Sequence, residues 1–162
     1  MTTIAVDTNG VIAADSRATR NHEIASWQAR KIEVVRHASG GCIYALSGED
    51  AMTKPAIKWH QDGAEPAKVP KGDPDTSWTL LVIEKDGLIF IYGDKSPYPL
   101  EVRAPYTMGS GRDFAMGAML AGASAKEAVE IACSRDVWSG LPIQVVVIAE
   151  ALGLAPVRVA AE

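Results

Sequence analysis

Residues 1–19 run Met1-Thr2-Thr3-Ile4-Ala5-Val6-Asp7-Thr8-Asn9-Gly10-Val11-Ile12-Ala13-Ala14-Asp15-Ser16-Arg17-Ala18-Thr19. Apolar residues alternate on both sides of Asn9-Gly10, a dipeptide that favours the tight turn of a β-hairpin. The stretch therefore predicts two antiparallel strands, at 2–8 and 11–18. Their pairing would bring Asp15 and Arg17 back towards Thr2.

Thr2 is a candidate nucleophile. An initiator methionine is usually removed when a small residue follows, so Thr2 can become the N-terminus. It would then carry a hydroxyl together with an α-amine of ordinary pKa about 7.7–8.0, which can act as a base near neutral pH. Retention of Met1 would block this chemistry. Many chains that begin Met-Thr use this end as an ordinary strand, so other positions must decide between the two interpretations.

The composition is that of an ordinary globular protein. The 162 residues are 48% hydrophobic and 22% charged, which predicts one domain, residues 1–162, with a sizeable core. The formal net charge is -4 without long runs of like charge, so neither nucleic acid nor an anionic membrane is expected as a partner. No apolar run is long enough to cross a bilayer, and the first residues lack a signal-peptide pattern, so we expect a cytoplasmic protein.

The cysteines and histidines predict no metal or redox site. Cys42 lies in a strand-like run and Cys133 in an apolar helical one, which favours buried free thiols. His22, His37 and His60 are scattered among polar residues without ligand spacing, so we expect them at the surface. The sequence thus predicts no metal and no cofactor.

The first half of the chain continues with strands and one helix. After a polar connection at 19–30, strands at 31–35 and 42–46 form a second predicted hairpin. Gly48 opens a predicted helix of about three turns whose inward residues are Ala51, Met52, Ile57 and Trp59. Residues 63–76 are rich in Pro and Gly and predict a loop.

The second half predicts a hairpin, two helices and a buried strand. Strands at 78–84 and 88–92 flank Asp86-Gly87, and a short strand follows at 100–103. Met108-Gly109-Ser110-Gly111 leads into a helix through Ala121, and the capping box at 124–127 opens a helix to about Asp136. That helix has an apolar stripe of Ala128, Val129, Ile131 and Ala132. A strand at 142–149, continuously apolar over 145–148, should be buried on both faces, and a last short strand lies at 156–159. This order indicates an α+β fold with helices outside the sheets.

Five segments match, in order, those of a known family. They are Thr2-Thr3-Ile4, residues 10–19, Arg30-Lys31-Ile32, Met108-Gly109-Ser110-Gly111 and residues 134–140 (Ser-Arg-Asp-Val-Trp-Ser-Gly). In these segments the chain resembles proteasome β-type subunits and their bacterial homologues, the N-terminal-nucleophile threonine peptidases. Nearest among them are the betaproteobacterial proteasome homologues and HslV, the peptidase partner of the HslU ATPase. The segment with Asp136 and Ser139 is more similar to true proteasome β subunits.

The resemblance implies a four-layer αββα sandwich of the N-terminal nucleophile hydrolase type. Only residues 48–76 are available where the family has two long helices, so one helical layer should be shortened. It also implies a self-compartmentalising threonine endopeptidase that cleaves peptide bonds of unfolded proteins or peptides. Such enzymes are homo-oligomers, here expected as two stacked rings of six or seven subunits, and some work with an ATP-dependent unfoldase.

The same resemblance assigns catalytic roles. Thr2 would attack the scissile carbonyl, Lys31 would stabilise the alkoxide as a cation, and Asp15 would hold Lys31 charged and oriented. The α-amine would be surrounded by Ser110, Asp136 and Ser139. Taken one at a time, these residues could instead be a turn acid, a surface lysine and helix caps. Their joint occurrence at family positions favours catalysis.

Other family positions concern the oxyanion and the substrate. The oxyanion donor would be a backbone N–H at the end of the strand that begins at 42, where Leu46 replaces the family's usual glycine; Leu46 and Ser47 are both candidates. Residues expected to line the first specificity pocket are Ala18, Ala29, Glu33, Tyr44 and Met52. Main-chain pairing with an extended substrate is expected at Thr19 and Gly48. Core packing is an equal alternative for Tyr44 and Met52.

Two other functions fit parts of this pattern. One is an N-terminal-nucleophile amidohydrolase acting on a small amide, and the other is a non-catalytic ring subunit. The helix at 113–122 is rich in Ala, Gly and Met and could pack on more than one side. The resemblance implies that this helix and the next form the contact between two stacked rings. Tight packing within one chain is the alternative.

Overall fold

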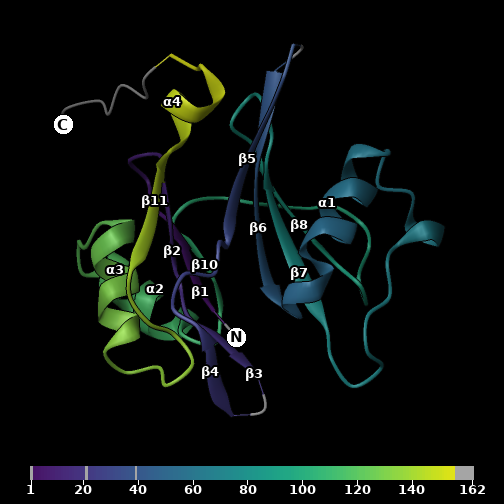
Figure 1. Cartoon of the computed structure of the whole chain (residues 1–162). Helices are drawn as coiled ribbons and strands as arrows, with labels where there is room; N and C mark the ends of the chain where they lie inside the picture. The colour runs from purple at the N-terminus through teal and green to yellow at the C-terminus, as the bar shows by residue number, and fades with distance from the viewer. Residues whose placement is uncertain (1, 21, 39, 156–162) are drawn as a thin grey trace.

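Two antiparallel β-sheets stack face to face in a computed structural model, which describes residues 2–20, 22–38 and 40–155 (Figure 1). The first sheet has the order β10 (Tyr106–Gly109), β1 (Thr3–Val6), β2 (Val11–Asp15) and β11 (Ile143–Val147). The second has the order β5 (Ile32–His37), β6 (Gly40–Gly48), β7 (Trp78–Ile83), β8 (Ile89–Gly93) and β9 (Leu100–Val102).

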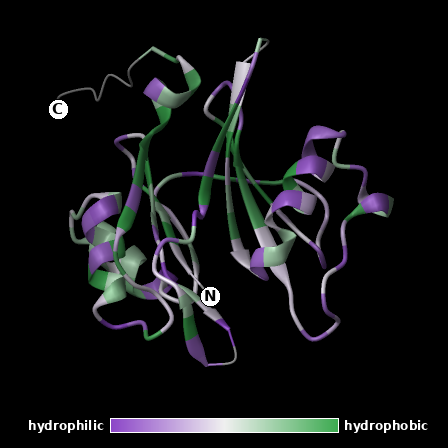
Figure 2. Ribbon diagram, viewed as in Figure 1, coloured by the Kyte–Doolittle hydropathy of each residue, from purple (hydrophilic) through white to green (hydrophobic). Residues whose placement is uncertain are grey.

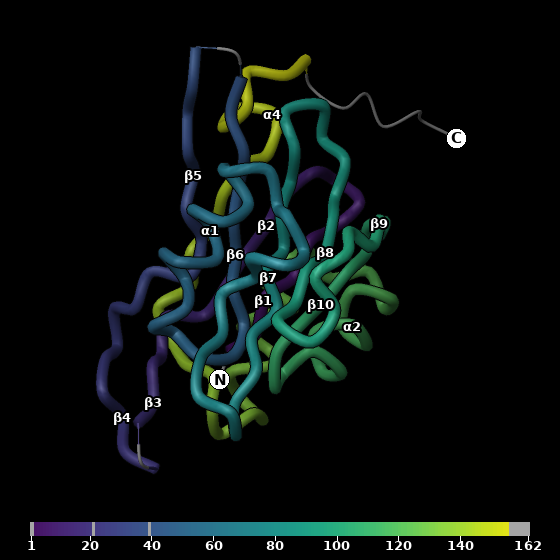
Figure 3. Tube along the Cα trace, turned by 90° about the vertical axis from the view of Figure 1, so that its right-hand side faces the viewer, coloured from purple at the N-terminus to yellow at the C-terminus, as the bar shows by residue number. Residues whose placement is uncertain are grey.

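Helices cover the outer faces of both sheets. On the first sheet lie α2 (Arg112–Leu120) and α3 (Ala125–Cys133), which contact β1 and β2. On the second lie the 3₁₀ turn η1 (Asp50–Met52) and α1 (Thr53–Gln61), with the short η2 (Pro66–Lys68) in the following loop and α1 in front of β6 and β7 in Figure 3. The expected αββα sandwich is therefore confirmed, and its shortened layer is the one formed by α1.

Strict alternation along the strands builds three apolar clusters. In β1, Ile4 and Val6 point between the sheets while Ala5 packs under α2 and α3. In β6, Ile43 points between the sheets, while Tyr44 packs under α1. Because successive side chains of a strand point to opposite faces, both faces of these central strands are buried. Figure 2 accordingly shows the most apolar segments on the strands and the most hydrophilic ones on helices and loops.

The predicted local signals are present. The hairpin at Asn9-Gly10 pairs Ile4 with Ala14, the hairpin at Asp86-Gly87 joins β7 and β8, and β9 follows. The capping box is complete, since the Ser124 hydroxyl accepts from the Glu127 N–H and the Glu127 carboxylate accepts from the Ser124 N–H. Within the described ranges no helix has both the length and the apolarity needed to cross a membrane.

Three short strands were missed. The connection predicted at 19–30 contains a two-stranded hairpin of β3 (Ala18–Arg20) and β4 (Glu23–Ser26). Its residues are half-exposed or exposed and its register shifts between Ala18 and Thr19, so it has no clean apolar alternation. The edge strand β10, which pairs with β1, was missed because the glycine-rich segment at its end was assigned to the start of a helix.

Some predicted burial was wrong. Val145 and Val147 are exposed because β11 is an edge strand, and the chain turns at Ile148 into the short helix α4 (Ile148–Leu152) instead of continuing as a strand. Ile131 is exposed, and Ala125 takes its place in the buried face of α3, which ends at Cys133 rather than near Asp136. In the same way Ala51 is exposed and Ala56 is buried.

His60 is the histidine for which the surface prediction was wrong. It lies half-buried near the end of α1, where Nδ1 is 3.2 Å from the Tyr44 hydroxyl and Nε2 is 3.3 Å from Glu84 Oε1. Burial lowers the pKa of His60, and Glu84 opposes that shift. His22 and His37 are exposed, and Cys42 and Cys133 are half-buried free thiols. The strand predicted at 156–159 lies outside the described residues.

Candidate active site

One end of the sandwich brings together side chains from both sheets. Thr2 directly precedes β1 and Asp15 ends β2, so the first hairpin sets them side by side. Lys31 directly precedes β5 of the second sheet. The β3–β4 hairpin projects from this same end (Figures 1 and 3).

Asp15 is the centre of this group. Its Oδ1 accepts hydrogen bonds from the Thr2 hydroxyl (2.8 Å), the Lys31 ammonium (2.7 Å) and the Thr3 N–H (2.9 Å). Its Oδ2 accepts from the N–H groups of Gly140 (2.9 Å) and Arg17 (3.0 Å). Asp15 has no solvent exposure, and so many donors compensate the burial of its charge. The carboxylate is therefore held in one orientation.

The Lys31 side chain is nearly buried, with 7% of its surface exposed. Burial lowers the pKa of Lys31, and the Asp15 carboxylate is the strongest group that opposes this shift. Asp50 opposes it more weakly. Because Nζ and the Thr2 hydroxyl share one carboxylate oxygen, the cation stands beside the candidate nucleophile.

A second network lies on the other side of Thr2. The hydroxyls of Ser110 and Ser139 each donate to Asp136 Oδ2 at 2.6 Å. Ser110 Oγ also lies 3.3 Å from the Thr2 carbonyl oxygen, while Ser139 Oγ lies 2.7 Å from the Thr3 hydroxyl. The six residues predicted to be catalytic thus form one connected group around Thr2.

Gly109 allows this network to approach Thr2. Its φ is +95°, and a Cβ there would overlap the Thr2 carbonyl oxygen. L-residues rarely adopt such a φ, so both backbone conformation and space require glycine. Ser110 follows directly and is thereby set against the Thr2 backbone.

Gln144 makes hydrogen bonds next to both Asp15 and Lys31 that the sequence did not reveal. Its Oε1 accepts from the Lys31 N–H at 3.0 Å. Its Nε2 donates to the Ala29 carbonyl (2.8 Å), the Ser16 hydroxyl (2.9 Å) and the Asp15 carbonyl (3.2 Å). One amide side chain on β11 thus ties the segment before β5 to the end of β2. In the sequence it is a single polar residue in an apolar strand, which was the available signal.

Thr2 and Lys31 line a cavity of about 550 Å³. Of the residues predicted to contact substrate, Ala18, Thr19 and Gly48 line it, as does Leu46. The missed lining residues include Arg17, Arg20, Glu49, Asp50, Asp73 and Thr76. The β3–β4 hairpin supplies part of this wall and the start of η1 another. A correct strand prediction at 18–26 would have indicated Arg20, but not the lining residues at 49–76.

Four predicted pocket residues do not line this cavity. Tyr44 and Met52 belong to the apolar cluster under α1, in agreement with the core alternative. Glu33 is half-buried on β5 opposite Tyr44, and Ala29 is held by its backbone to Ser16 and Gln144.

The end of β6 offers one open backbone N–H near Thr2. Pairing between β5 and β6 ends at Ile32 and Ala45, whereas pairing with β7 continues to Gly48. In an antiparallel ladder consecutive residues turn their N–H groups to opposite sides. Of Leu46 and Ser47, one therefore faces β7 and the other faces the space that β5 has left.

Comparison with solved structures identifies the fold. HslV from Trypanosoma brucei superposes with a TM-score of 0.67 at 17% identity, over 90% of this chain and 98% of that chain. BPH from Thiobacillus denitrificans superposes with a TM-score of 0.62 at 21% identity, over 91% of this chain and 98% of that chain. Its complex with epoxomicin superposes with a TM-score of 0.64 at 20% identity, over 91% of this chain and 99% of that chain. The chain has the proteasome-subunit fold. The resemblance expected from the sequence motifs is thereby confirmed, although no family model and no curated protein matches the sequence.

Proposed function

We propose that this chain is a threonine-type endopeptidase whose nucleophile is Thr2, made N-terminal by removal of Met1. One observation carries the proposal: a single buried carboxylate oxygen of Asp15 accepts both the Thr2 hydroxyl and the Lys31 ammonium. A nucleophilic hydroxyl needs a base and a nearby positive charge. Here Lys31 supplies the charge, and the α-amine of a processed Thr2 supplies the base.

The first half-reaction forms an ester. Thr2 Oγ attacks the scissile carbonyl carbon as the hydroxyl proton passes to the α-amine, directly or through a water molecule. Lys31 stabilises the developing negative charge on Oγ, and its effect is strong because the site is poorly solvated. The C–N bond then breaks, and the α-amine returns the proton to the leaving nitrogen.

The second half-reaction releases the acyl part. Water gives a proton to the α-amine and adds to the ester carbon. When the C–O bond breaks, the protonated amine returns this proton to Thr2 Oγ, which regenerates the hydroxyl and the free amine and releases the carboxylic acid. Ser110, Asp136 and Ser139 are proposed to orient the amine in both halves, and the 2.6 Å bonds from the two serine hydroxyls to Asp136 hold these three side chains together. The open N–H of Leu46 or Ser47 stabilises the oxyanion in each tetrahedral intermediate.

Substrate is proposed to bind in the Thr2 cavity as an extended chain. The edges of β3 and β6 at Thr19 and Gly48 flank this cavity and suit strand addition, in which main-chain hydrogen bonds hold a peptide of any sequence. This favours peptides or unfolded proteins over a small amide. Ala18 adds a small apolar surface to the same wall.

Assembly into two stacked homo-oligomeric rings of six or seven subunits is part of the proposal. An exposed peptidase site without sequence selectivity would damage other proteins, and a ring encloses it. HslV and BPH share the fold, and α2 and α3 leave Phe114, Leu120 and Ile131 exposed on one outer face. A cytoplasmic location and an ATP-dependent unfoldase partner are consistent with such a chamber.

Mass spectrometry of the purified protein with and without epoxomicin tests the proposal. We expect the intact mass to lack Met1, and epoxomicin to add once, on the N-terminal peptide. A chain that keeps Met1 and stays unmodified would oppose the threonine mechanism. A processed chain that is unmodified and cleaves no peptide would favour a non-catalytic subunit. Cleavage of small amides but not of peptides would favour the amidohydrolase.

A further inference from the structure

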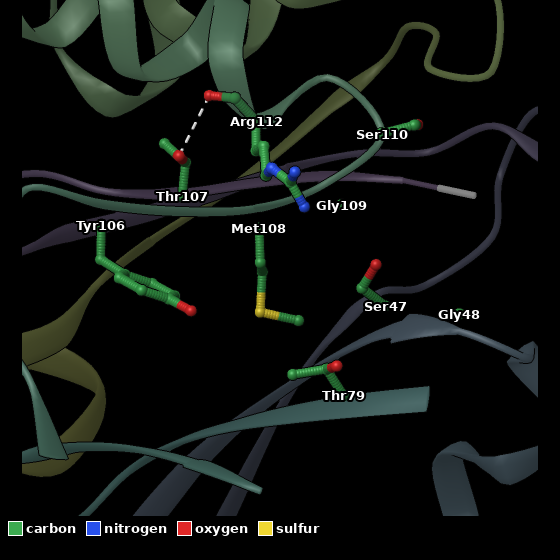
Figure 4. A pocket seen from close by; sticks show the side chains of 9 residues that line it. All are labelled: Ser47, Gly48, Thr79, Tyr106, Thr107, Met108, Gly109, Ser110 and Arg112. Atoms are coloured by element: carbon green, nitrogen blue, oxygen red, sulfur yellow. Dashed lines mark hydrogen bonds between the residues drawn. The ribbon is translucent and has the colours of Figure 1, made fainter. Parts of the chain in front are cut away.

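A second cleft lies between the two sheets on the far side of Thr2. Its volume is about 400 Å³, and its walls come from β10 and the start of α2 on one sheet and from the end of β6 and the start of β7 on the other. Figure 4 shows Tyr106, Met108, Ser47 and Thr79 pointing into the shared space. None of the six residues predicted to be catalytic lines it except Ser110.

This cleft adjoins the Thr2 cavity. Gly48 lines both spaces, and Gly109, which lines the second, packs against the Thr2 backbone. Ser110 lines the second cleft and reaches the Thr2 carbonyl at 3.3 Å. A chain that crosses Thr2 from the first cavity therefore enters this cleft.

The chemistry of Thr2 gives the two cavities different roles. In the proposed mechanism the α-amine returns its proton to the leaving nitrogen, so the leaving segment must lie on the amine's side. Ser110 reaches the Thr2 carbonyl at 3.3 Å and Asp136 at 2.6 Å, is one of the groups proposed to orient this amine, and lines the second cleft. The acyl segment then occupies the cavity beside Thr19 and the leaving segment occupies the cleft.

The cleft is polar and carries positive charge. Hydroxyls of Ser47, Thr79 and Tyr106 face it, and Arg112 is the cation among its lining residues. In the part of the chain that the structure describes, no carboxylate lines the cleft. The Arg112 ion pair with Asp113 is long, at 3.4 Å, and the Asp113 side chain is 90% exposed, so solvent screens it. Burial raises the pKa of Tyr106 and nearby Arg112 opposes the shift, so the phenol remains a neutral hydrogen-bonding group.

We propose that this cleft binds the leaving side of the cleaved peptide and that Arg112 selects a carboxylate there. The inference rests on the proposed peptidase function. A guanidinium binds carboxylates through charge-assisted, often bidentate hydrogen bonds. The carboxylate can come from an acidic side chain or from the free C-terminus of a short leaving segment. These two groups lie at different places on the substrate.

Matched substrates separate these sources. All substrates share one acyl segment. The first is an aminomethylcoumarin amide, which has no peptide on the leaving side. The others are quenched peptides with Asp, Ala or Lys two positions beyond the scissile bond. Each peptide is made with an amidated end, and the Ala peptide also with a free carboxylate two residues beyond the bond. The enzymes are wild type, Arg112→Gln and Arg112→Lys, with Arg36→Gln at an exposed position on β5 as control.

The expected result is a change confined to leaving-side preference. Wild type and Arg36→Gln should cleave a carboxylate-bearing peptide on the order of 10-fold better than the Lys peptide, as one charge-assisted hydrogen bond predicts. Arg112→Gln should lose this preference, Arg112→Lys should keep part of it, and the coumarin amide should be cleaved equally by all four. If only the Asp peptide is favoured, the selected group is a side chain; if only the free carboxylate, it is the C-terminus.

Other outcomes oppose the inference. The role of Arg112 is overturned if Arg112→Gln keeps the leaving-side preference, or if wild type cleaves all peptides at equal rates. In either case, cleavage of the coumarin amide would still support the peptidase proposal. If wild type cleaves neither the peptides nor the coumarin amide, the proposed function fails and this inference falls with it.

Discussion

The ammonium nitrogen of Lys31 lies 2.7 Å from Oδ1 of Asp15, and the two side chains are 7% and 0% exposed. The pair joins the two sheets, because Asp15 ends β2 and Lys31 precedes β5. A buried ion pair is seldom a large source of stability, since desolvation of both charges offsets their attraction. In the proposed mechanism the pair acts on the Thr2 hydroxyl, which shares Oδ1 of Asp15 with Lys31.

Substitution of Thr2 tests the nucleophile. Thr2→Ala should abolish peptide hydrolysis, because only Thr2 can offer a hydroxyl and an α-amine on one residue, while Thr2→Ser should keep part of the activity. Thermal unfolding should change little in both variants. The exposed Thr8 provides a control, since Thr8→Ala should be fully active. Full activity in Thr2→Ala would exclude the mechanism.

Removal of the Lys31 charge tests its catalytic role. Lys31→Met keeps most of the side-chain length and should lower kcat/KM by on the order of 10²-fold or more, as loss of a charge that stabilises the transition state predicts. Asp15→Asn should also lower kcat/KM strongly, for the same reason, and should destabilise the fold. Lys58→Met on the exposed face of α1 is the control. Near-normal turnover in Lys31→Met would assign Lys31 a structural role.

The pH profile should report the environment of Lys31. Burial lowers its pKa, so kcat/KM should fall at high pH as Lys31 loses its proton, earlier than for an ordinary lysine. Asp15 and, more weakly, Asp50 raise this pKa. Hence Asp15→Asn should move the alkaline limb of residual activity to lower pH by the larger step and Asp50→Asn by the smaller. Asp73→Asn, elsewhere in the cavity wall, should leave the limb in place. An unmoved limb in Asp15→Asn would show that another group titrates there.

How much of the site was predictable depends on which contacts are local. Thr2 and Asp15 could be paired from the sequence because a tight turn at Asn9-Gly10 sets the register of one hairpin. Lys31 could not be placed beside them by any local pattern, because it belongs to the other sheet, and periodicity does not say how two sheets stack. Only the resemblance to proteasome subunits supplied that contact, together with those of Ser110 and Asp136.

The errors have a common physical origin. An apolar residue was taken as buried wherever it fitted a period, but Val145 lies on an edge strand and Ile131 on the outer face of α3. Conversely, the β3–β4 hairpin was missed because a strand exposed on its surface shows no apolar alternation. Gln144 was passed over because its partners are backbone groups, which sequence composition does not report.

Gln144 should matter through Lys31. Gln144→Leu has similar size but leaves the backbone groups of Lys31, Ala29 and Asp15 without this partner, at a cost of about 1–3 kcal/mol for each buried group left unsatisfied. We expect lower thermal stability and a fall in kcat that exceeds the rise in KM, with a shifted alkaline limb as Lys31 moves. Gln28→Leu at an exposed position is the control. A loss of stability with an unchanged pH profile would make Gln144 structural only.

The last prediction concerns assembly through α2 and α3. Within the Met-rich segment at 113–122, Met119 is buried in the core of its own chain, so a charge there would damage the fold. Leu120, 74% exposed on α2, is a sharper probe, and Tyr98, 67% exposed before β9 of the other sheet, is a matched control.

Light scattering coupled to gel filtration should give wild type and Tyr98→Glu the mass of two rings. Leu120→Glu should give half that mass, because a charge cannot be buried without a partner between two apolar faces. Its peptidase activity should fall with the loss of the double ring, while circular dichroism should match wild type. A wild-type protein that is monomeric yet cleaves peptides would contradict the chamber and favour the small-amide hydrolase. A double ring that persists in Leu120→Glu would place the contact away from the exposed end of α2.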